Sequence, residues 1–220
     1  MNRATLTRIR LSLALLTERR LALYAWIDFL LAFVGLAIAF SGARGSSMEF
    51  YFPFFLLPVL LIGIPMLSDT VAVERRSGTL DLALTSPGAR FYFERRVLAV
   101  ATLMIVQGWV GVLLAFLLAE NFDLITPFVQ VITVSLFVTA AALNWSVRFR
   151  SAGAVTFATY ATAVLFAPWF FSNPIHPPTT LQPRLLEHWI DYGQQNFVLV
   201  LAASVFYLYA RQRVATPERV

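Results

Sequence analysis

Residues 124–147 read LITPFVQVITVSLFVTAAALNWSV, and residues 148–150 that follow read RFR. The run carries no charged side chain, and it is longer than the roughly 20 apolar residues that a helix needs to cross a bilayer. Arginine directly after an apolar run is typical of the cytoplasmic end of a span. The stretch therefore predicts a transmembrane helix that ends on the cytoplasmic side.

Five other stretches are similarly apolar, and the six predicted spans are 21–40, 50–68, 97–119, 124–147, 152–171 and 193–210. Of the 220 residues, 59% are hydrophobic and 13% are charged, whereas soluble domains are near half apolar and a quarter charged. A soluble core of this size cannot hide so much apolar surface. We expect an all-α integral membrane protein, with six transmembrane helices in a single transmembrane domain over residues 1–220.

The arginines orient these spans. All 17 basic residues are arginine, and 15 of them precede span one, separate spans two and three, or follow spans four and six. The opposite links hold Arg44 and Arg184. Because basic residues accumulate in cytoplasmic segments, both chain ends are expected to be inside. Cleavage of a signal peptide near residues 37–39 is the alternative, but the charged region before the first span is long for one.

Two residue types are missing from the sequence, and this excludes several kinds of chemistry. Without cysteine, the chain has no disulfide, thiolate metal site or thiol nucleophile. Without lysine, it has no phosphate-binding loop ending in Lys-Ser or Lys-Thr, so ATP hydrolysis would belong to another polypeptide. The net charge of +5 indicates contact with anionic lipid head groups rather than nucleic acid, because the arginines lie beside apolar runs.

Two segments outside the spans are expected to lie in the membrane interface. In residues 1–20, leucine and isoleucine recur at helical spacing between positions 6 and 16, which predicts an interfacial helix. A plain positively charged leader is the alternative. Residues 172–192 begin with prolines, which exclude regular helix there. We expect a re-entrant or interfacial element on the outer side, with a short helix over 185–190.

The cytoplasmic link over residues 69–96 is longer than a connector needs to be. Residues 74–76 are expected to continue the helix of span two, and Gly78 to end it. Thr79 caps a short new helix with apolar side chains, which ends at Pro87. A second amphipathic stretch then leads into span three. Apolar side chains on a helix outside the lipid indicate a docking surface for a cytoplasmic partner.

Residues 74–87, which read ERRSGTLDLALTSP, resemble the signature of ABC transporter permeases of the ABC-2 type. In that family a Glu, a Gly-Thr-Leu-Glu-like step and a leucine-rich run ending in Pro lie between spans two and three. The interfacial helix, the six spans and the proline-broken outer segment are also similar, so the resemblance covers nearly the whole chain. In one departure, Arg95 and Arg96 stand where the family commonly has Gly-Lys before span three.

The resemblance implies a permease subunit of an exporter, not an enzyme by itself, in a bacterial or archaeal cytoplasmic membrane. Its partners would be ATP-binding cassette ATPase subunits and a second permease half, the same or a related chain. ATP and Mg²⁺ would bind on the ATPase, and this chain would hold no cofactor. The link would be the coupling helix that docks on the ATPase and moves with spans two and three. The expected docking residues are Glu74, Arg75, Gly78, Thr79, Leu80, Asp81, Leu84 and Pro87.

Polar residues are isolated within the predicted spans. Asp28 is either a gate or substrate contact, or an interfacial carboxylate paired with an N-terminal arginine. Hydrogen bonds between helices explain Gln107, Gln130 and Asn144, with a substrate path through Gln107 and Asn144 as the alternative.

Other functions remain open. A haem-exporter B-type permease of cytochrome c maturation has a similar length and six spans, although residues 74–80 fit the ABC-2 pattern better. From other classes, the chain would be a membrane scaffold, an assembly factor or a gradient-driven carrier. A carrier would show paired inverted repeats and buried charges near mid-bilayer, for which Asp28 alone is too little. His176 and His188 lack the compact spacing of metal ligands, so no metal site is expected.

Overall fold

The computed structural model describes residues 26, 29–30, 33–34, 37, 59–69, 89–118, 125–170 and 184–215. In this part of the chain all regular structure is helical and no strand occurs, which confirms the predicted all-α fold for these residues. The elements are η2 (Val59–Gly63), α6 (Ala89–Leu118), α7 (Ile125–Arg148), α8 (Ala152–Leu165), α9 (Ala167–Phe170) and α10 (Arg184–Ala215). Residues 64–69 continue the π-helical turn η2 as an α-helix.

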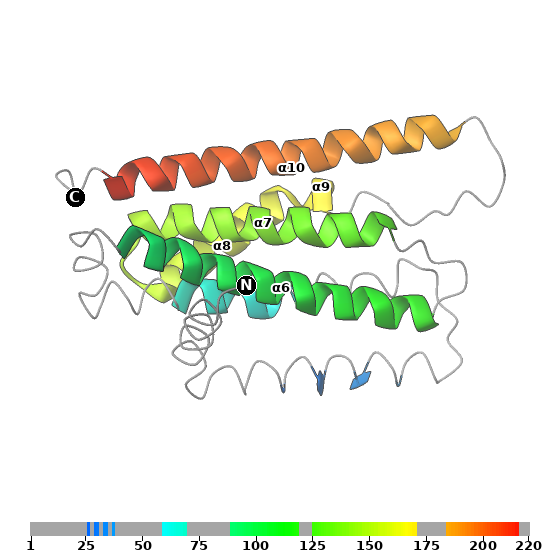
Figure 1. Cartoon of the computed structure of the whole chain (residues 1–220), viewed down its shortest axis with the longest axis horizontal. Helices are drawn as coiled ribbons and strands as arrows, with labels where there is room; N and C mark the ends of the chain where they lie inside the picture. The colour runs from blue at the N-terminus through cyan, green and yellow to red at the C-terminus, as the bar shows by residue number, and fades with distance from the viewer. Residues whose placement is uncertain are drawn as a thin grey trace, which may run out of the picture.

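Helix α7 lies at the centre of the described bundle, between α6 on one side and α10 on the other (Figure 1). Helices α6 and α8 are joined to α7 by short links and run antiparallel to it. Helix α10 instead runs parallel to α7. Its residues meet α7 in rising order, Asn196 beside Thr133, Phe206 beside Phe137 and Ala210 beside Leu143. The C-terminal ends of α7 and α10 therefore lie at the same end of the bundle.

The hydrophobic core is centred on Phe137 of α7, which is fully buried. Its ring centroid lies 4.7 Å from that of Phe166, after α8, and 5.9 Å from that of Phe206 of α10. Rings at these separations attract beyond their area of contact. Phe137 therefore joins three segments of the chain, and the buried residues around it include Ile64, Leu67, Met104, Val131, Val134 and Leu199.

One helical stretch of the described residues, Pro127–Arg148, is long and apolar enough to cross a membrane, judged by length and composition. Most of it is buried inside the bundle. Three shorter apolar helices, Leu60–Asp69, Leu98–Leu113 and Ala152–Leu165, lie within or next to the predicted spans two, three and five. These observations identify one candidate span among the described residues.

Two helices extend beyond their predicted spans. Helix α6 begins at Ala89 rather than at residue 97, so the end of the predicted link is continuous with it. Helix α10 begins at Arg184 rather than at residue 193 and includes the residues predicted as a separate short helix. An apolar run predicts only the part of a helix that suits lipid, so it underestimates the length of these two helices. Residues 89–96 and 184–192 contain no proline that would end a helix there. Residues 172–183 and 1–20 lie outside the described residues.

Helix α7 agrees with its predicted span to one residue, and α8 begins where span five was predicted to begin. Ser151 caps α8, since its Oγ accepts a hydrogen bond of 3.1 Å from the Ala154 amide. The predicted single span is broken at Phe166, after which α9 forms a short further helix. Pro168 explains the break, because its ring would clash with the carbonyl four residues earlier and it has no N–H to donate.

The turn η2 precedes Pro65, which has the same effect on the helix of residues 59–69. Pro65 lacks the N–H that an α-helix would donate to the carbonyl of Leu61. The hydroxyl of Tyr160 on α8 donates a hydrogen bond of 3.3 Å to that carbonyl. Gly63 lies in the same turn, where a Cβ would overlap the thioether end of Met104 on α6. This turn is therefore held by α8 through a hydrogen bond and by α6 through close packing.

Candidate functional site

Helix α7 carries an unusual number of buried polar side chains for so apolar a helix, namely Gln130, Thr133, Ser135, Thr139, Asn144 and Ser146. Two of these hydroxyls bond to their own helix and need no other partner. Thr139 donates to the Ser135 carbonyl at 2.7 Å, and Ser146 donates to the Leu143 carbonyl at 2.7 Å. Such local bonds satisfy a hydroxyl without linking helices.

Other polar groups of α7 fix the neighbouring helices. Thr133 Oγ1 donates to Asn196 Oδ1 of α10 at 2.6 Å, and Asn196 Nδ2 donates to the Tyr192 carbonyl at 2.9 Å. On another face, Trp145 Nε1 donates to Thr162 Oγ1 of α8 at 2.9 Å. Bonds between helices stabilise association where lipid provides no hydrophobic drive. The expected role of polar residues as links between helices is thus seen at residues that the sequence did not single out.

Among the buried polar side chains of α7, those of Ser135 and Asn144 each have an oxygen, Oγ and Oδ1, without a hydrogen-bond partner in the described structure. Ser135 is 0% exposed and Asn144 is 2% exposed. A buried polar atom without a partner costs about 1–3 kcal/mol. The two residues are nine positions apart, which places them on opposite faces of α7 and about 13 Å apart along its axis. They therefore do not form one site.

Gln107 and Asn144, the two described residues of the predicted substrate path, do not lie near each other either. Gln107 of α6 is half-buried, at the edge of the face that α6 turns to the core. In the antiparallel pair of α6 and α7, Trp109 Nε1 donates to the Phe128 carbonyl at 3.3 Å. That contact sets Gln107 level with the start of α7, whereas Asn144 lies near its end, about 20 Å farther along. A continuous path through both would have to follow most of the length of α7.

The remaining predicted site residues, Asp28, Glu74, Arg75, Gly78, Thr79, Leu80, Asp81, Leu84 and Pro87, lie outside the described residues. Their link joins α6 at Ala89. Because α6 is antiparallel to α7, this junction is at the end where α7 and α10 finish (Figure 1). Among the described residues, no group of three or more His, Asp or Glu side chains is placed to hold a metal ion.

Arginine and aromatic side chains meet where α7 and α10 end. The Cζ atom of Arg148 lies 5.0 Å from the ring centroid of Trp145 and 4.7 Å from that of Tyr209. Arg213 Cζ lies 5.5 Å from the Tyr209 centroid, and its Nε donates to the Tyr209 hydroxyl at 3.1 Å. We call these four residues the arginine–aromatic cluster. The sequence predicted arginines on one side of the membrane, but contained no signal for their contact with Tyr209.

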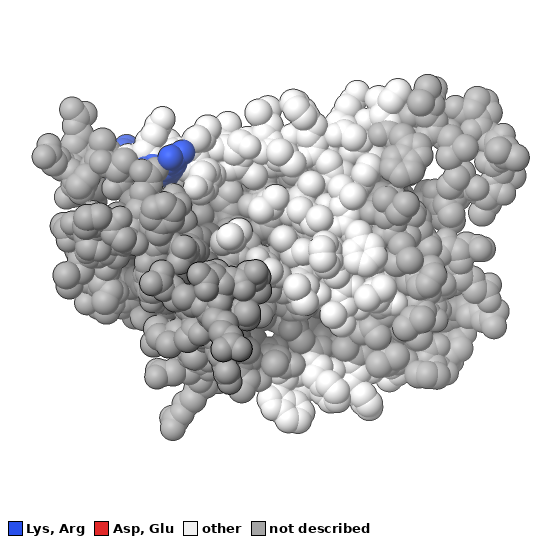
Figure 2. Space-filling model, viewed as in Figure 1, with Lys and Arg blue, Asp and Glu red and all other residues white. Residues whose placement is uncertain are grey.

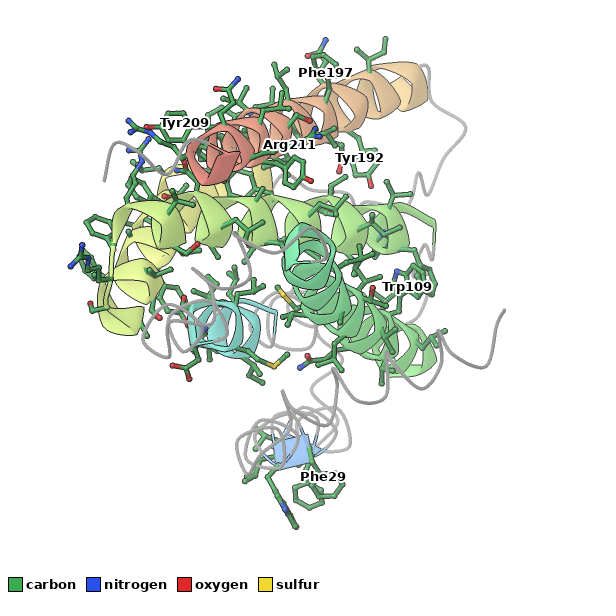
Figure 3. The ribbon with its side chains drawn as sticks, turned by 60° about the vertical axis from the view of Figure 1, so that its left-hand side comes forward. Phe29, Trp109, Tyr192, Phe197, Tyr209 and Arg211 are labelled. Atoms are coloured by element: carbon green, nitrogen blue, oxygen red, sulfur yellow. The ribbon has the colours of Figure 1, made fainter. Side chains whose placement is uncertain are left out.

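The cluster lies at the basic end of the described surface. Figure 2 shows basic side chains gathered at one end of the face in view, while the rest of the described surface on that face is uncharged. Figure 3 shows Tyr209 and Arg211 on the last turns of α10, and Phe197 nearer the middle of the same helix. Arg148 and Arg213 are both exposed, so the cluster is open to a ligand from outside the bundle.

No protein-family model matches the chain, and no curated protein or solved structure matches it significantly.

Proposed function

We propose that the chain is the transmembrane permease subunit of an ATP-binding cassette exporter in the cytoplasmic membrane of a bacterium or archaeon. It has six spans with both ends in the cytoplasm, and it pairs with a second permease half. The cargo is a lipid-like, polymeric or amphipathic molecule, and a separate subunit hydrolyses the ATP. Residues 69–96 contain the coupling helix.

The outer surface of the described bundle supports a membrane location. Large apolar side chains are exposed on α6, α8 and α10, and Phe157 and Phe197 are 77% and 66% exposed. Soluble monomers rarely expose contiguous apolar surface over several helices. Beneath this surface α7 buries the polar groups described above. An apolar outside around a partly polar inside suits a helical bundle in lipid.

The helix directions support the proposed orientation. Helix α6 starts, and helices α7 and α10 end, at one end of the bundle (Figure 1). The sequence places Arg90, Arg95 and Arg96 in the first turns of α6, and further arginines follow at the ends of the other two helices. Cytoplasmic segments are enriched in arginine and lysine. The alternation of directions is the one that spans three to six require.

The main support for the proposal is the end of the bundle at which the motif of residues 74–87 is joined to α6. The resemblance of residues 74–87 to the ABC-2 signature would mean little on the outer side, where no ATPase is present. The link joins α6 at the arginine-rich end, which is the proposed cytoplasmic side. Helix α6 then continues unbroken for 30 residues, or about 45 Å. A rigid helix of that length would carry movement of the docked link into the bundle.

The proposal is tested by co-purification with an ATPase encoded beside this chain. On a helix over residues 79–86, Leu80 and Leu84 share one face, and Leu82 lies on the other. We expect Leu84→Asp to reduce recovery of the ATPase at least tenfold, because it buries an uncompensated charge in the docking surface. Leu82→Asp, the matched control with the same change of side chain and charge, should retain most of it.

Unchanged recovery of the ATPase with both Leu80→Asp and Leu84→Asp would refute the docking role of this link. Equal losses with Leu84→Asp and Leu82→Asp would also count against it, because they would reflect a general effect of charge in the link. Each variant is first checked for monodisperse elution in detergent, so that loss of the fold is not mistaken for loss of docking.

A further inference from the structure

The arginine–aromatic cluster brings two cations together on one aromatic ring. Since the Cζ atoms of Arg148 and Arg213 lie 4.7 and 5.5 Å from the Tyr209 centroid, they are at most about 10 Å apart, close enough to repel. Among the described side chains, no carboxylate forms an ion pair with either arginine. An anion between the two guanidinium groups would remove the repulsion.

The contacts that hold the arginines leave donors for such an anion. A cation–π contact depends on the ring quadrupole and uses no N–H donor. Arg213 uses its Nε for the Tyr209 hydroxyl, and the terminal nitrogens of a guanidinium carry four more N–H groups. Arginine presents these groups in a planar fork that matches the oxygens of a phosphate. The cluster thus has the donors and the charge of a phosphate site.

An apolar surface adjoins the cluster on α10. Leu201, Val205 and Leu208 are exposed and recur at helical spacing, on the flank of α10 next to Tyr209. The row leads from the cluster toward the middle of the helix. A free phosphate would have no use for it, whereas the acyl chain of a phospholipid would lie along it while the head group meets the arginines.

We propose that the arginine–aromatic cluster is a binding site for the phosphate of an anionic phospholipid in the cytoplasmic leaflet, with the acyl chains lying against the exposed apolar row of α10. The site uses side chains from the ends of two helices that are distant in sequence. The inference rests on the proposed membrane placement and orientation, and it does not depend on an ATPase partner.

Trp145 provides a direct test, because it is part of the cluster. A variant that keeps Trp145 and replaces the other four tryptophans by Phe is reconstituted in phosphatidylcholine bilayers. Brominated phosphatidylglycerol or brominated phosphatidylcholine is then added at equal mole fraction, and quenching of Trp145 is measured. We expect the anionic lipid to be enriched around Trp145 about fivefold or more over the zwitterionic lipid, since each arginine near the surface contributes about that factor.

Two double variants separate a built site from general surface charge. Arg148→Gln with Arg213→Gln should remove most of the enrichment. Arg150→Gln with Arg211→Gln removes the same charge at the same end of the bundle, but neither arginine contacts a ring in the described structure. The control should therefore keep most of the enrichment. Equal losses in both doubles, or equal quenching by the two lipids in the parent variant, would overturn the proposal.

Adding inorganic phosphate at constant ionic strength tells whether the cluster binds a soluble anion or a lipid head group. Relief of the quenching would assign the cluster to free phosphate and would overturn the lipid site, whereas a lipid site leaves the quenching unchanged.

If the single-tryptophan variant does not elute as a monodisperse species, native mass spectrometry of the unmodified chain replaces it. Retained phosphatidylglycerol should then be lost with Arg148→Gln and Arg213→Gln but not with the control. Loss of ATPase co-purification with the enrichment intact would refute the proposed function alone.

Discussion

Replacing the buried amide of Asn144 is predicted to stabilise the fold, whereas most substitutions of buried residues destabilise it. Asn144 is 2% exposed, and its Oδ1 has no hydrogen-bond partner within the described structure. Leucine has the same branching at Cγ, so Asn144→Leu keeps the shape of the side chain and removes the buried polar atoms. Leaving a polar atom without a partner costs about 1–3 kcal/mol, and we expect the substitution to stabilise the fold by about that amount.

A second substitution on the same helix should have the opposite sign. Thr133 is also buried, but its hydroxyl donates to Asn196 Oδ1 at 2.6 Å. Thr133→Val keeps the shape and removes that bond between helices, which in bilayers is worth about 0.6 kcal/mol on average and up to about 1.7 kcal/mol. The two variants should therefore differ in free energy of unfolding by about 1.5 kcal/mol or more.

The measurement is reversible unfolding in detergent micelles, with denaturant titrated and helix content followed by circular dichroism. The slope of free energy against denaturant must be unchanged between variants for the comparison to hold. Ser135→Ala provides an internal replicate on the opposite face of α7, since Ser135 Oγ also has no described partner. A loss of 1 kcal/mol or more with Asn144→Leu would refute the reasoning, because it would mean that the oxygen is hydrogen-bonded in the folded protein.

Two further predictions concern glycines with opposite surroundings. Gly63→Val should destabilise the fold by about 1–3 kcal/mol, because a Cβ there overlaps Met104. Met104→Ala should recover part of this loss in the double variant. If the two losses of stability simply add in the same unfolding assay, the contact is contradicted. Gly193→Ala should stabilise α10 by about 0.5–1 kcal/mol, because a Cβ at this helical position meets nothing within 4 Å; a decrease in the unfolding midpoint would show that this glycine is needed for packing.

The predicted spans agree with the observed helices to different degrees. Helix α7 agrees to one residue because Asp123 precedes its apolar run and Arg148 follows it. At α6 and α10 the backbone continues as helix beyond the apolar run, through Glu94, Arg95 and Arg96 in α6 and through residues 184–192 in α10, so span length underestimates helix length. The break at Phe166 follows from Pro168, a helix breaker whose effect the hydropathy of the span does not reveal.

The contacts of the candidate sites were less accessible to prediction. The sequence indicates that Asn144 and Gln107 are unusual in their apolar surroundings, but it does not tell which helix each one faces. The bond of Thr133 with Asn196 and the contact of Arg148 with Tyr209 join positions more than 60 residues apart. Such pairs depend on α10 packing against α7 rather than against another helix, and one sequence contains no signal for that neighbourhood.

The parallel packing of α7 and α10 also has an electrostatic consequence. The aligned peptide dipoles of a helix leave about half a negative charge at its C-terminal end. In antiparallel pairs, such as α7 with α6 or α8, opposite poles are neighbours and attract. Between α7 and α10 two negative poles are neighbours, and Arg148 and Arg213 lie in the last turns of these helices. Arg148 and Arg213 therefore offset a repulsion between the ends of α7 and α10 that the antiparallel pairs of α7 with α6 and α8 do not have.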